Sequence, residues 1–332
     1  MRKNINQETI EGRIYDHALQ MKTVTNKDSK NFGTEFINGH LDIATDEEGL
    51  NVIPVYYTYV TEYTKNNTIN NTFVNLKQIL ENGKTWAKDG KEAAMKVRLT
   101  PSIALNDFYP NGGDQLVSQQ RNEGGFVSFI SDFNPNEKAR NKFTFDVIIE
   151  NVTLISANPE SNITEDFVKI NAKAFNFRND ILPITLIAKD SKAPGSVNYF
   201  LSLNASASNP IYTKVIGEIV NTTITINKQM ENAFGSMMVD TSTRQEREWI
   251  ITWAQPQPYA FDIAETITRE ELDKAIADRN LHLEEVKAQA KAYYAQKKAG
   301  AATPTPQAAV PNPGMMGNIP QGTFNFGGMP NW

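Results

Sequence analysis

Apolar and polar side chains alternate with a period of two over most of residues 10–255, and this pattern constrains the fold more than any other feature of the chain. In the stretch EFINGHLDIAT, Ile37, Leu41 and Ile43 are apolar, while the positions between them are polar or glycine. Such alternation is typical of a strand with one buried and one exposed face. The pattern predicts a mainly β protein whose sheets are solvated on one side.

The first half of the chain predicts strands at 12–22, 35–45, 51–61, 93–105 and 124–130, with a helix at 72–83. Five strands with one helix between the third and the fourth match the plan of the OB-fold. That fold is a small Greek-key barrel whose second and third strands and flanking loops bind oligonucleotides or oligosaccharides. We therefore expect an N-terminal OB-fold.

The second half repeats the strand pattern at 141–155, 166–177, 181–190, 197–204, 214–226 and 247–254, with no obvious helix among them. This series predicts a second, OB-like barrel, and a β-sandwich is the alternative. The segment SDFNPNEKARN, which contains Pro135, indicates the boundary between the halves.

A long helix and a low-complexity tail follow the strands. Thr268 and Glu271 form a capping-box pattern, and apolar residues then recur every three, four or seven positions, which predicts a helix at 268–298. The last residues are rich in Pro, Gly and Gln, which is typical of disorder. The expected domains are 1–135 (OB-fold), 136–265 (second β domain), 266–299 (helix) and 300–332 (disordered tail).

The composition argues against several classes of chemistry. The chain of 332 residues has no Cys and only three His, so thiol catalysis and Cys-built metal sites are excluded and a His-built site is disfavoured. The nucleotide-binding, zinc-protease and hydrolase motifs are also absent. We expect no catalytic residues, no metal and no cofactor, and hence a protein that is not an enzyme.

The amino terminus lacks a signal-peptide pattern, and no stretch has 18 consecutive apolar residues. We expect a cytoplasmic protein without a membrane partner. The net charge of -5 concerns solubility and long-range steering rather than any local face.

Aromatic and basic residues coincide on the elements where an OB-fold binds its ligand. A single-strand binder needs rings for bases to stack on and cations for the phosphates. Tyr56, Tyr57 and Tyr59 occupy four positions of the third strand, so both of its faces carry a ring. The predicted nucleic-acid-binding residues are Lys22, Lys27, Lys30, Phe36, Tyr56, Tyr57, Tyr59, Lys84, Trp86, Lys88, Lys91, Lys96, Arg98, Lys169, Lys173 and Phe175.

The stretches EGRIYDHALQMKTVTNKDSKNFGTEFINGHLDIATDEEGLNVIPVYYTYV and KTWAKDGKEAAMKVRLTPSIALNDFY resemble OB-fold single-stranded DNA-binding proteins of the phage or prophage type. The resemblance covers about the first 130 residues. It implies single-stranded DNA as the partner, a role in replication or recombination, and the host cytoplasm as the location if the protein is phage-encoded. By position it implies stacking on Phe36, Tyr56, Tyr57 and Trp86, with Lys96 and Arg98 beside them.

Bacterial members of this class end in an acidic tail that recruits replication enzymes. This chain ends in GTFNFGGMPNW, without an acidic side chain. The resemblance implies partner docking through Phe324, Phe326 and Trp332, and these rings are equally suited to nucleic acid or to another subunit. The helix at 268–298 can pack on its own domain or pair with a second copy in a homo-oligomer.

Two other functions fit the same sequence. A structural or assembly protein of a phage particle is also β-rich, rich in Asn and Thr, and free of Cys. A carbohydrate-binding module can use the same barrel face for sugars. Because fold alone does not assign function, the residues of the site must distinguish these alternatives.

Overall fold

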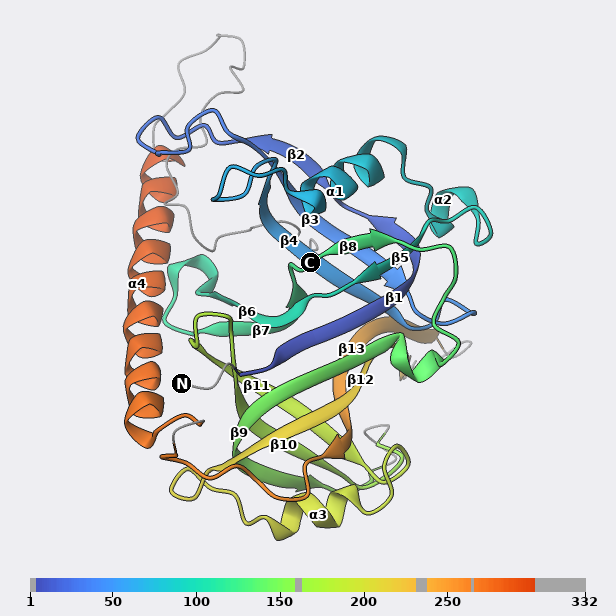
Figure 1. Ribbon diagram of the computed structural model, residues 1–332, viewed down its shortest axis with the longest axis vertical. Helices are drawn as coiled ribbons and strands as arrows, with labels where there is room; N and C mark the ends of the chain where they lie inside the picture. The colour runs from blue at the N-terminus through green and yellow to red at the C-terminus, as the bar shows by residue number, and fades with distance from the viewer. Residues whose placement is uncertain (1–3, 159–162, 231–237, 264–265, 302–332) are drawn as a thin grey trace.

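The computed structural model describes residues 4–158, 163–230, 238–263 and 266–301, with the backbone only over 222–230, 238–246 and 298–301. Two β-barrels lie one above the other, and a long helix borders both of them (Figure 1). The protein is therefore mainly β, with a C-terminal helix, as the alternation of side chains predicts.

The N-terminal barrel closes through five strand positions. β1 pairs with β3, β3 pairs with β4, and β4 runs parallel to β7. β7 then pairs with β6. The strand just before β6, which is β5, pairs with β1 and closes the ring. Its elements are β1 Asn6–His17, β2 Gln20–Thr23, β3 Glu35–Ala44, β4 Val52–Thr61, α1 Asn71–Asn82, α2 Trp86–Asp89, β5 Lys96–Leu99, β6 Ser102–Phe108, η1 Pro110–Gly112, β7 Val117–Glu123, β8 Val127–Phe129 and η2 Glu137–Ala139.

The C-terminal barrel repeats this topology. β9 pairs with β10, β10 with β11, β11 runs parallel to β13, and β13 pairs with β12, which returns to β9. Its elements are β9 Asn141–Ile155, β10 Phe167–Phe175, β11 Ile181–Lys189, α3 Ser196–Ser202, β12 Ile211–Met230 and β13 Met238–Ala254. The closed ring identifies the second half as a barrel rather than a β-sandwich, and five strands with a helix after the third match the OB plan.

The first strands of the two barrels join them. Residues 6–10 of β1 pair with residues 141–145 of β9, so one sheet runs through both barrels. A single core cluster follows the sheet from Ile14 in β1 to Phe145 in β9 and Ile251 in β13. The division of the chain at residue 135 remains a prediction, because paired strands and a shared core cross it.

The C-terminal helix α4, Arg269–Ala301, bridges the barrels. Its first turn begins with the predicted capping box: the Glu271 carboxylate accepts from the Thr268 amide, and the Thr268 hydroxyl accepts from the Glu271 amide. Leu272 packs on the C-terminal barrel, and Val286 and Ala290 pack on Tyr109 of the N-terminal barrel. The helix thus holds both barrels along one side.

Four strand predictions need correction. The predicted strand at 12–22 is interrupted between His17 and Gln20, and the one at 124–130 is the short β8, which pairs with β5. The segment 197–204 forms helix α3, because Gly195 turns the chain at a φ of 83° and the Asp190 carboxylate accepts from the Val197 amide. The predicted strand at 93–105 breaks between Leu99 and Ser102, and its second part pairs with β7, a strand that the sequence pattern did not indicate. A proline at 101 removes a donor there, which favours the break.

Helix α1 offers a first testable prediction. The Asn70 side chain caps the helix by accepting from the Thr72 amide at 3.1 Å, and its amide group donates to the Thr61 carbonyl of β4. We expect Asn70→Ala to lower the free energy of unfolding by about 1 kcal/mol, as measured by urea denaturation. Asn70→Ser, which retains a capping oxygen, should lose less, and equal losses in both variants would contradict a capping role.

Candidate nucleic-acid interface

The outer face of β3 and β4 carries paired aromatic rings. Because Ile37, Leu41 and Ile43 fill the barrel, the alternate side chains of β3 face outward. The Phe36 ring lies 4.6 Å from the Tyr59 ring, centroid to centroid. Four residues along β3, past a glycine, the His40 imidazole lies 5.4 Å from the Tyr56 ring. We call these four residues the aromatic face.

A bulge in β4, where Thr58 and Tyr59 lie opposite Asn38 of β3, sets the spacing of the aromatic face. The register of β3 on β4 shifts between Ile37 and Gly39, and Gly39 has a φ of 135°. A Cβ on Gly39 would lie 2.2 Å from the Ala18 carbonyl oxygen, so only glycine allows this close approach. The bulge leaves Phe36 beside Tyr59 and His40 beside Tyr56.

Positive charge borders the aromatic face. The Arg121 guanidinium lies 5.2 Å from the centroid of the Tyr56 ring, and the Glu123 carboxylate holds it at 2.7 Å. The Lys22 ammonium donates to the Asn38 side chain at 3.1 Å. Exposed Lys27 and Lys30 lie on the loop between β2 and β3. Lys22, Lys27 and Lys30 can meet the phosphates of a strand whose bases stack on the rings, whereas Arg121, which is 11% exposed and paired with Glu123, supports the Tyr56 ring.

The charge of His40 depends on Asp42. The hydrogen bond from the imidazole to the Asp42 carboxylate raises the pKa of His40, and burial opposes this effect in part. The two groups are 3.5 Å apart. His40 therefore retains its proton to higher pH than an ordinary histidine does.

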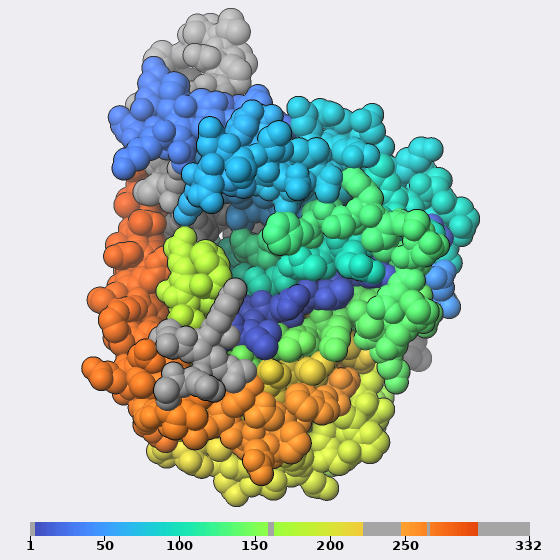
Figure 2. Space-filling view, viewed as in Figure 1, coloured from blue at the N-terminus to red at the C-terminus, as the bar shows by residue number. Residues whose placement is uncertain are grey.

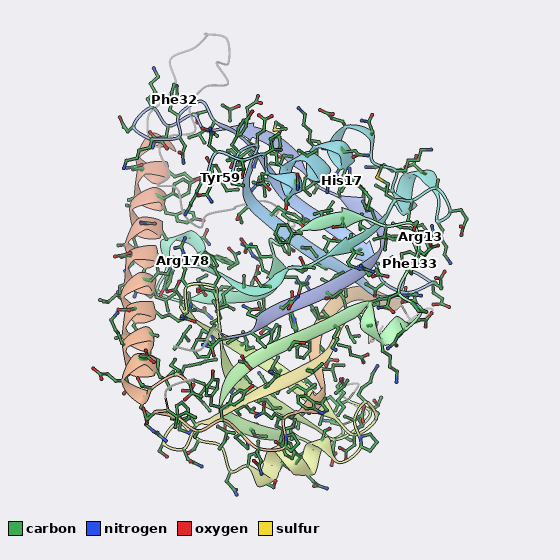
Figure 3. All side chains as sticks on the ribbon, in the orientation of Figure 1. Arg13, His17, Phe32, Tyr59, Phe133 and Arg178 are labelled. Carbon is green, nitrogen blue, oxygen red and sulfur yellow. The ribbon has the colours of Figure 1, made fainter. Side chains whose placement is uncertain are left out.

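The β2–β3 loop adds an exposed ring at the same end of the barrel. Phe32 is 53% exposed on a turn in which its amide donates to the Ser29 carbonyl, and Figure 3 shows it beyond Tyr59. The loop is closed at its base by a hydrogen bond from the Val24 amide to the Thr34 carbonyl. Loop and sheet together form one surface of rings and lysines.

Tyr57 does not belong to this surface. Its ring is 1% exposed and packs in the barrel core with Ile53 and Val55, so a base cannot stack on it. The expectation that both faces of β4 carry a ring is confirmed, but the inward ring is structural. The predicted residues that the structure brings together are Lys22, Lys27, Lys30, Phe36, Tyr56 and Tyr59.

The predicted basic cluster at 84–98 lies elsewhere. Trp86 of α2 packs against Tyr15 and against Gly49 in the β3–β4 turn. That turn follows Ala44, eight residues beyond Phe36 and hence about 26 Å along β3. The resemblance predicts Trp86 beside the strand rings, and the structure separates the two groups.

Most cations of this cluster already have partners. Ion pairs join Lys88 to Asp16 at 3.2 Å, Lys91 to Glu47 at 2.7 Å, and Arg98 to the buried Glu11 at 2.7 Å. The Lys96 ammonium donates to the Ser131 carbonyl and lies 5.2 Å from the Phe133 ring, and Lys84 is exposed. These contacts fasten α2 and the inter-barrel segment to the N-terminal barrel.

On the C-terminal barrel, Lys169 is exposed, but the other two predicted residues are not available. Phe175 is fully buried by Ile267 and Leu272 at the start of α4, although its position in the β alternation does face outward. The Lys173 ammonium pairs with the Glu150 carboxylate and its side chain is 12% exposed. The tail residues Phe324, Phe326 and Trp332 lie outside the described residues.

Sequence reasoning missed three residues of the surface. His40 shares the strand parity of Phe36, a signal that was present in the alternation. Phe32 could have been found as an aromatic residue in a polar loop. Arg121 could not, because it reaches Tyr56 only through the parallel pairing of β4 with β7, which joins segments more than sixty residues apart.

The protein is a tandem OB-fold protein, with two consecutive five-stranded Greek-key barrels. The first barrel carries an aromatic and basic outer face. The family model YorF matches residues 5–289, and the chain belongs to the YorF family. No curated protein matches the sequence.

Two crystal structures of the single-stranded DNA-binding protein from Thermus aquaticus are similar to this chain. A deletion mutant is 12% identical, with a TM-score of 0.44, and the match covers 80% of this chain and 100% of that chain. The wild-type protein is 12% identical, with a TM-score of 0.43 and coverage of 78% and 96%. At these TM-scores neither similarity determines the function of this chain.

None of the helices among the described residues combines the length and the apolar character needed to cross a bilayer.

Proposed function

We propose that this protein binds single-stranded DNA without catalysing a reaction. The observation that carries the proposal is the aromatic face, where the Phe36 and Tyr59 rings lie 4.6 Å apart on the second and third strands of the barrel and Arg121 covers Tyr56. In OB-folds this face and its loops hold oligonucleotides. Bases stack on the rings, and Lys22, Lys27 and Lys30 follow the phosphates.

Stacking explains why no base-specific groove is needed. Every base has a π-face, so a row of rings accepts any sequence. In duplex DNA the bases are stacked on one another, so their π-faces are not free to stack on the protein rings. We therefore infer preference for single strands, and a role in protecting them during phage DNA replication or recombination in the host cytoplasm. The tail aromatics Phe324, Phe326 and Trp332 are proposed to recruit the replication or recombination partners.

The test is a salt series. Fluorescence anisotropy with labelled oligo-dT should give an affinity that falls with salt, with a log–log slope of roughly -0.7 for each phosphate neutralised. A duplex of the same length should bind more weakly. The control is an uncharged oligosaccharide, because a carbohydrate-binding module would bind it with little salt dependence. Absence of salt-dependent binding to oligo-dT would contradict the proposal and favour a structural role in a particle.

A further inference from the structure

The turn between β10 and β11 is a rigid platform. The Asn176 side-chain oxygen accepts from the amides of Arg178 and Asp180 at 2.8 and 2.9 Å, and the Asn176 amide donates to the Asp180 carbonyl at 3.0 Å. Asn179 takes a φ of 65°, which asparagine tolerates better than most residues. The backbone of residues 176–180 is therefore fixed before any ligand arrives, which lowers the entropy cost of binding.

This platform presents an aromatic ring and a guanidinium together. Phe177 is 84% exposed, more than any other aromatic side chain of the described residues, and Arg178 lies 5.1 Å from its ring centroid. No carboxylate among the described residues pairs with Arg178. The nearby cations of α4 differ in this respect, since Lys274 pairs with Asp278 at 2.6 Å and Arg279 with Asp107 at 2.9 Å.

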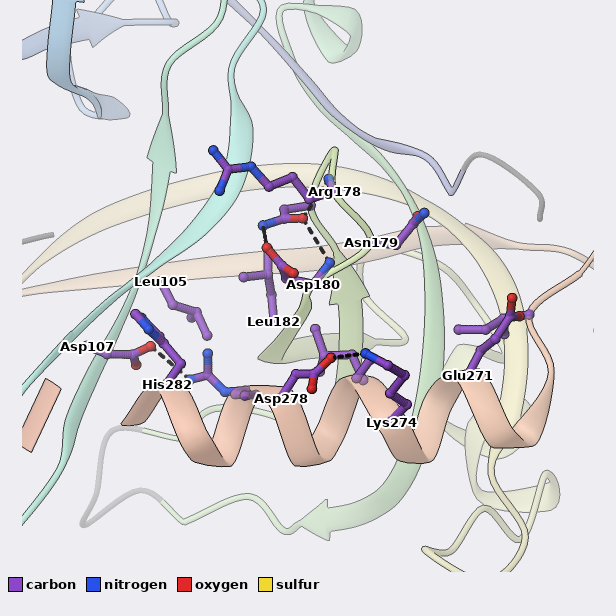
Figure 4. A pocket seen from close by; sticks show the side chains of 15 residues that line it. Leu105, Asp107, Arg178, Asn179, Asp180, Leu182, Glu271, Lys274, Asp278 and His282 are labelled. Atoms are coloured by element: carbon purple, nitrogen blue, oxygen red, sulfur yellow. Dashed lines mark hydrogen bonds and ion pairs between the residues drawn. The ribbon is translucent and has the colours of Figure 1, made fainter. Parts of the chain in front are cut away.

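The platform lies where the two barrels and α4 meet. Arg178 lines a hollow of about 720 Å³ together with Leu105 of β6 and His282 of α4 (Figure 4). In Figure 2 the yellow-green turn stands at the surface between the orange helix α4 and the blue residues of the N-terminal barrel. In the view of Figure 3, Phe32, Tyr59 and Arg178 lie one below another on the side of the molecule that α4 borders. A ligand on the aromatic face can therefore extend to this turn.

We propose that the Phe177–Arg178 turn is a second contact point for single-stranded nucleic acid, located on the C-terminal barrel. One base stacks on the Phe177 ring, and an adjacent phosphate pairs with the Arg178 guanidinium at the mouth of the hollow. This inference rests on the proposed function. We assign the binding role on this barrel to the Phe177–Arg178 turn instead of the outer face of β10. On that face α4 covers the Phe175 ring, and Glu150 pairs with Lys173.

The test compares two oligo-dT lengths. A strand of about 6 nucleotides fits on one barrel, whereas one of about 30 nucleotides exceeds the 4 to 16 that a single OB-fold holds. Phe177→Ala should weaken binding of the long strand roughly 5- to 150-fold, as expected for one stacked base, and leave the short strand unaffected. Arg178→Ala should also make the salt slope for the long strand less steep by about 0.7.

Phe126→Ala is the matched control, since Phe126 is a comparably exposed phenylalanine, 71%, on a turn of the N-terminal barrel beside α1. It should bind both strands as the wild type does, and thermal melts should be unchanged in all three variants. Wild-type affinity of Phe177→Ala and Arg178→Ala for the long strand, or an equal loss for both strands, would overturn the second contact. If the wild type binds neither strand, the proposed function itself fails.

Discussion

Replacing Phe36 and Tyr59 together by alanine should weaken oligo-dT binding by roughly 2 to 4 kcal/mol, because two stacking surfaces are lost. The two rings touch, so the loss need not equal the sum of the single losses. The slope of log affinity against log salt should stay unchanged, since neither side chain is charged. Fluorescence anisotropy across a salt series measures both quantities.

Two controls separate stacking from other effects. Tyr59→Phe retains the ring and should retain the affinity, whereas a contact made through the Tyr59 hydroxyl would be lost. Replacing Lys22, Lys27 and Lys30 together by alanine removes charge instead of rings. This variant should therefore make the slope of log affinity against log salt less steep. If the ring variant instead flattens the slope while keeping its affinity at low salt, the aromatic face does not hold bases.

The alternation of side chains predicts most strands and the topology class, but not β7 or helix α3. Buried Ile37, Leu41 and Ile43 established the orientation of β3, and from it the exposure of Phe36. The same rule put Tyr57 and Tyr56 on opposite faces of β4 but did not say which faced the core. The burial of Ile53 and Val55, which share the parity of Tyr57, decides it, and the bulge in β4 then turns Tyr59 to the outward face. A local irregularity therefore decided which ring could meet a ligand.

Phe175 shows a second limit. The alternation of β10 places Phe175 on the outward face, yet the ring is buried, because the start of α4, nearly a hundred residues later in the chain, covers it. The basic cluster at 84–98 shows the same limit for charge, since Glu11 of the neighbouring strand β1 pairs with Arg98 and Asp16 of β1 pairs with Lys88. Whether a lysine or arginine is solvated or ion-paired depends on contacts between distant segments, which the local sequence pattern does not show.

Glu8 shows how the junction between the barrels responds to pH. It lies on β1 with its side chain fully buried, and its carboxyl accepts from the Trp249 indole of β13 at 2.9 Å, while the second oxygen has no hydrogen-bond partner. Burial raises the pKa of Glu8 to about 8, although the Trp249 hydrogen bond and the charge of Arg247 act in the opposite direction. At neutral pH the carboxyl is thus mainly protonated and uncharged.

The sign of the effect on stability follows from this pKa. Below pH 4.5, the ordinary value, Glu8 is protonated in both the folded and the unfolded chain and costs nothing. Between pH 4.5 and about 8 the unfolded chain releases the proton while the folded chain retains it. Stability therefore falls as pH rises through this window and levels off above it, once the folded carboxyl also ionises.

We expect Glu8→Gln to remove this part of the pH dependence. Glutamine has nearly the same shape, its amide oxygen can accept from Trp249, and it does not titrate. Urea unfolding at several pH values from 5 to about 9 should show the variant gaining stability relative to the wild type as pH rises. Glu92→Gln is the charge-matched control, since Glu92 is 84% exposed in its pair with Arg13, and its difference from the wild type should vary little with pH.

The difference between wild type and variant isolates Glu8 from His17 and His40, which titrate in both proteins. Parallel stability curves for the wild type and Glu8→Gln would show that the Glu8 carboxyl is not the source of any pH dependence. Because Glu8 lies on β1 and its partner Trp249 on β13, ionisation of Glu8 places a desolvated charge between the two barrels. The loss of stability at high pH should therefore be largest for contacts across the β1–β9 seam, which amide hydrogen exchange of residues 6–10 and 141–145 can measure.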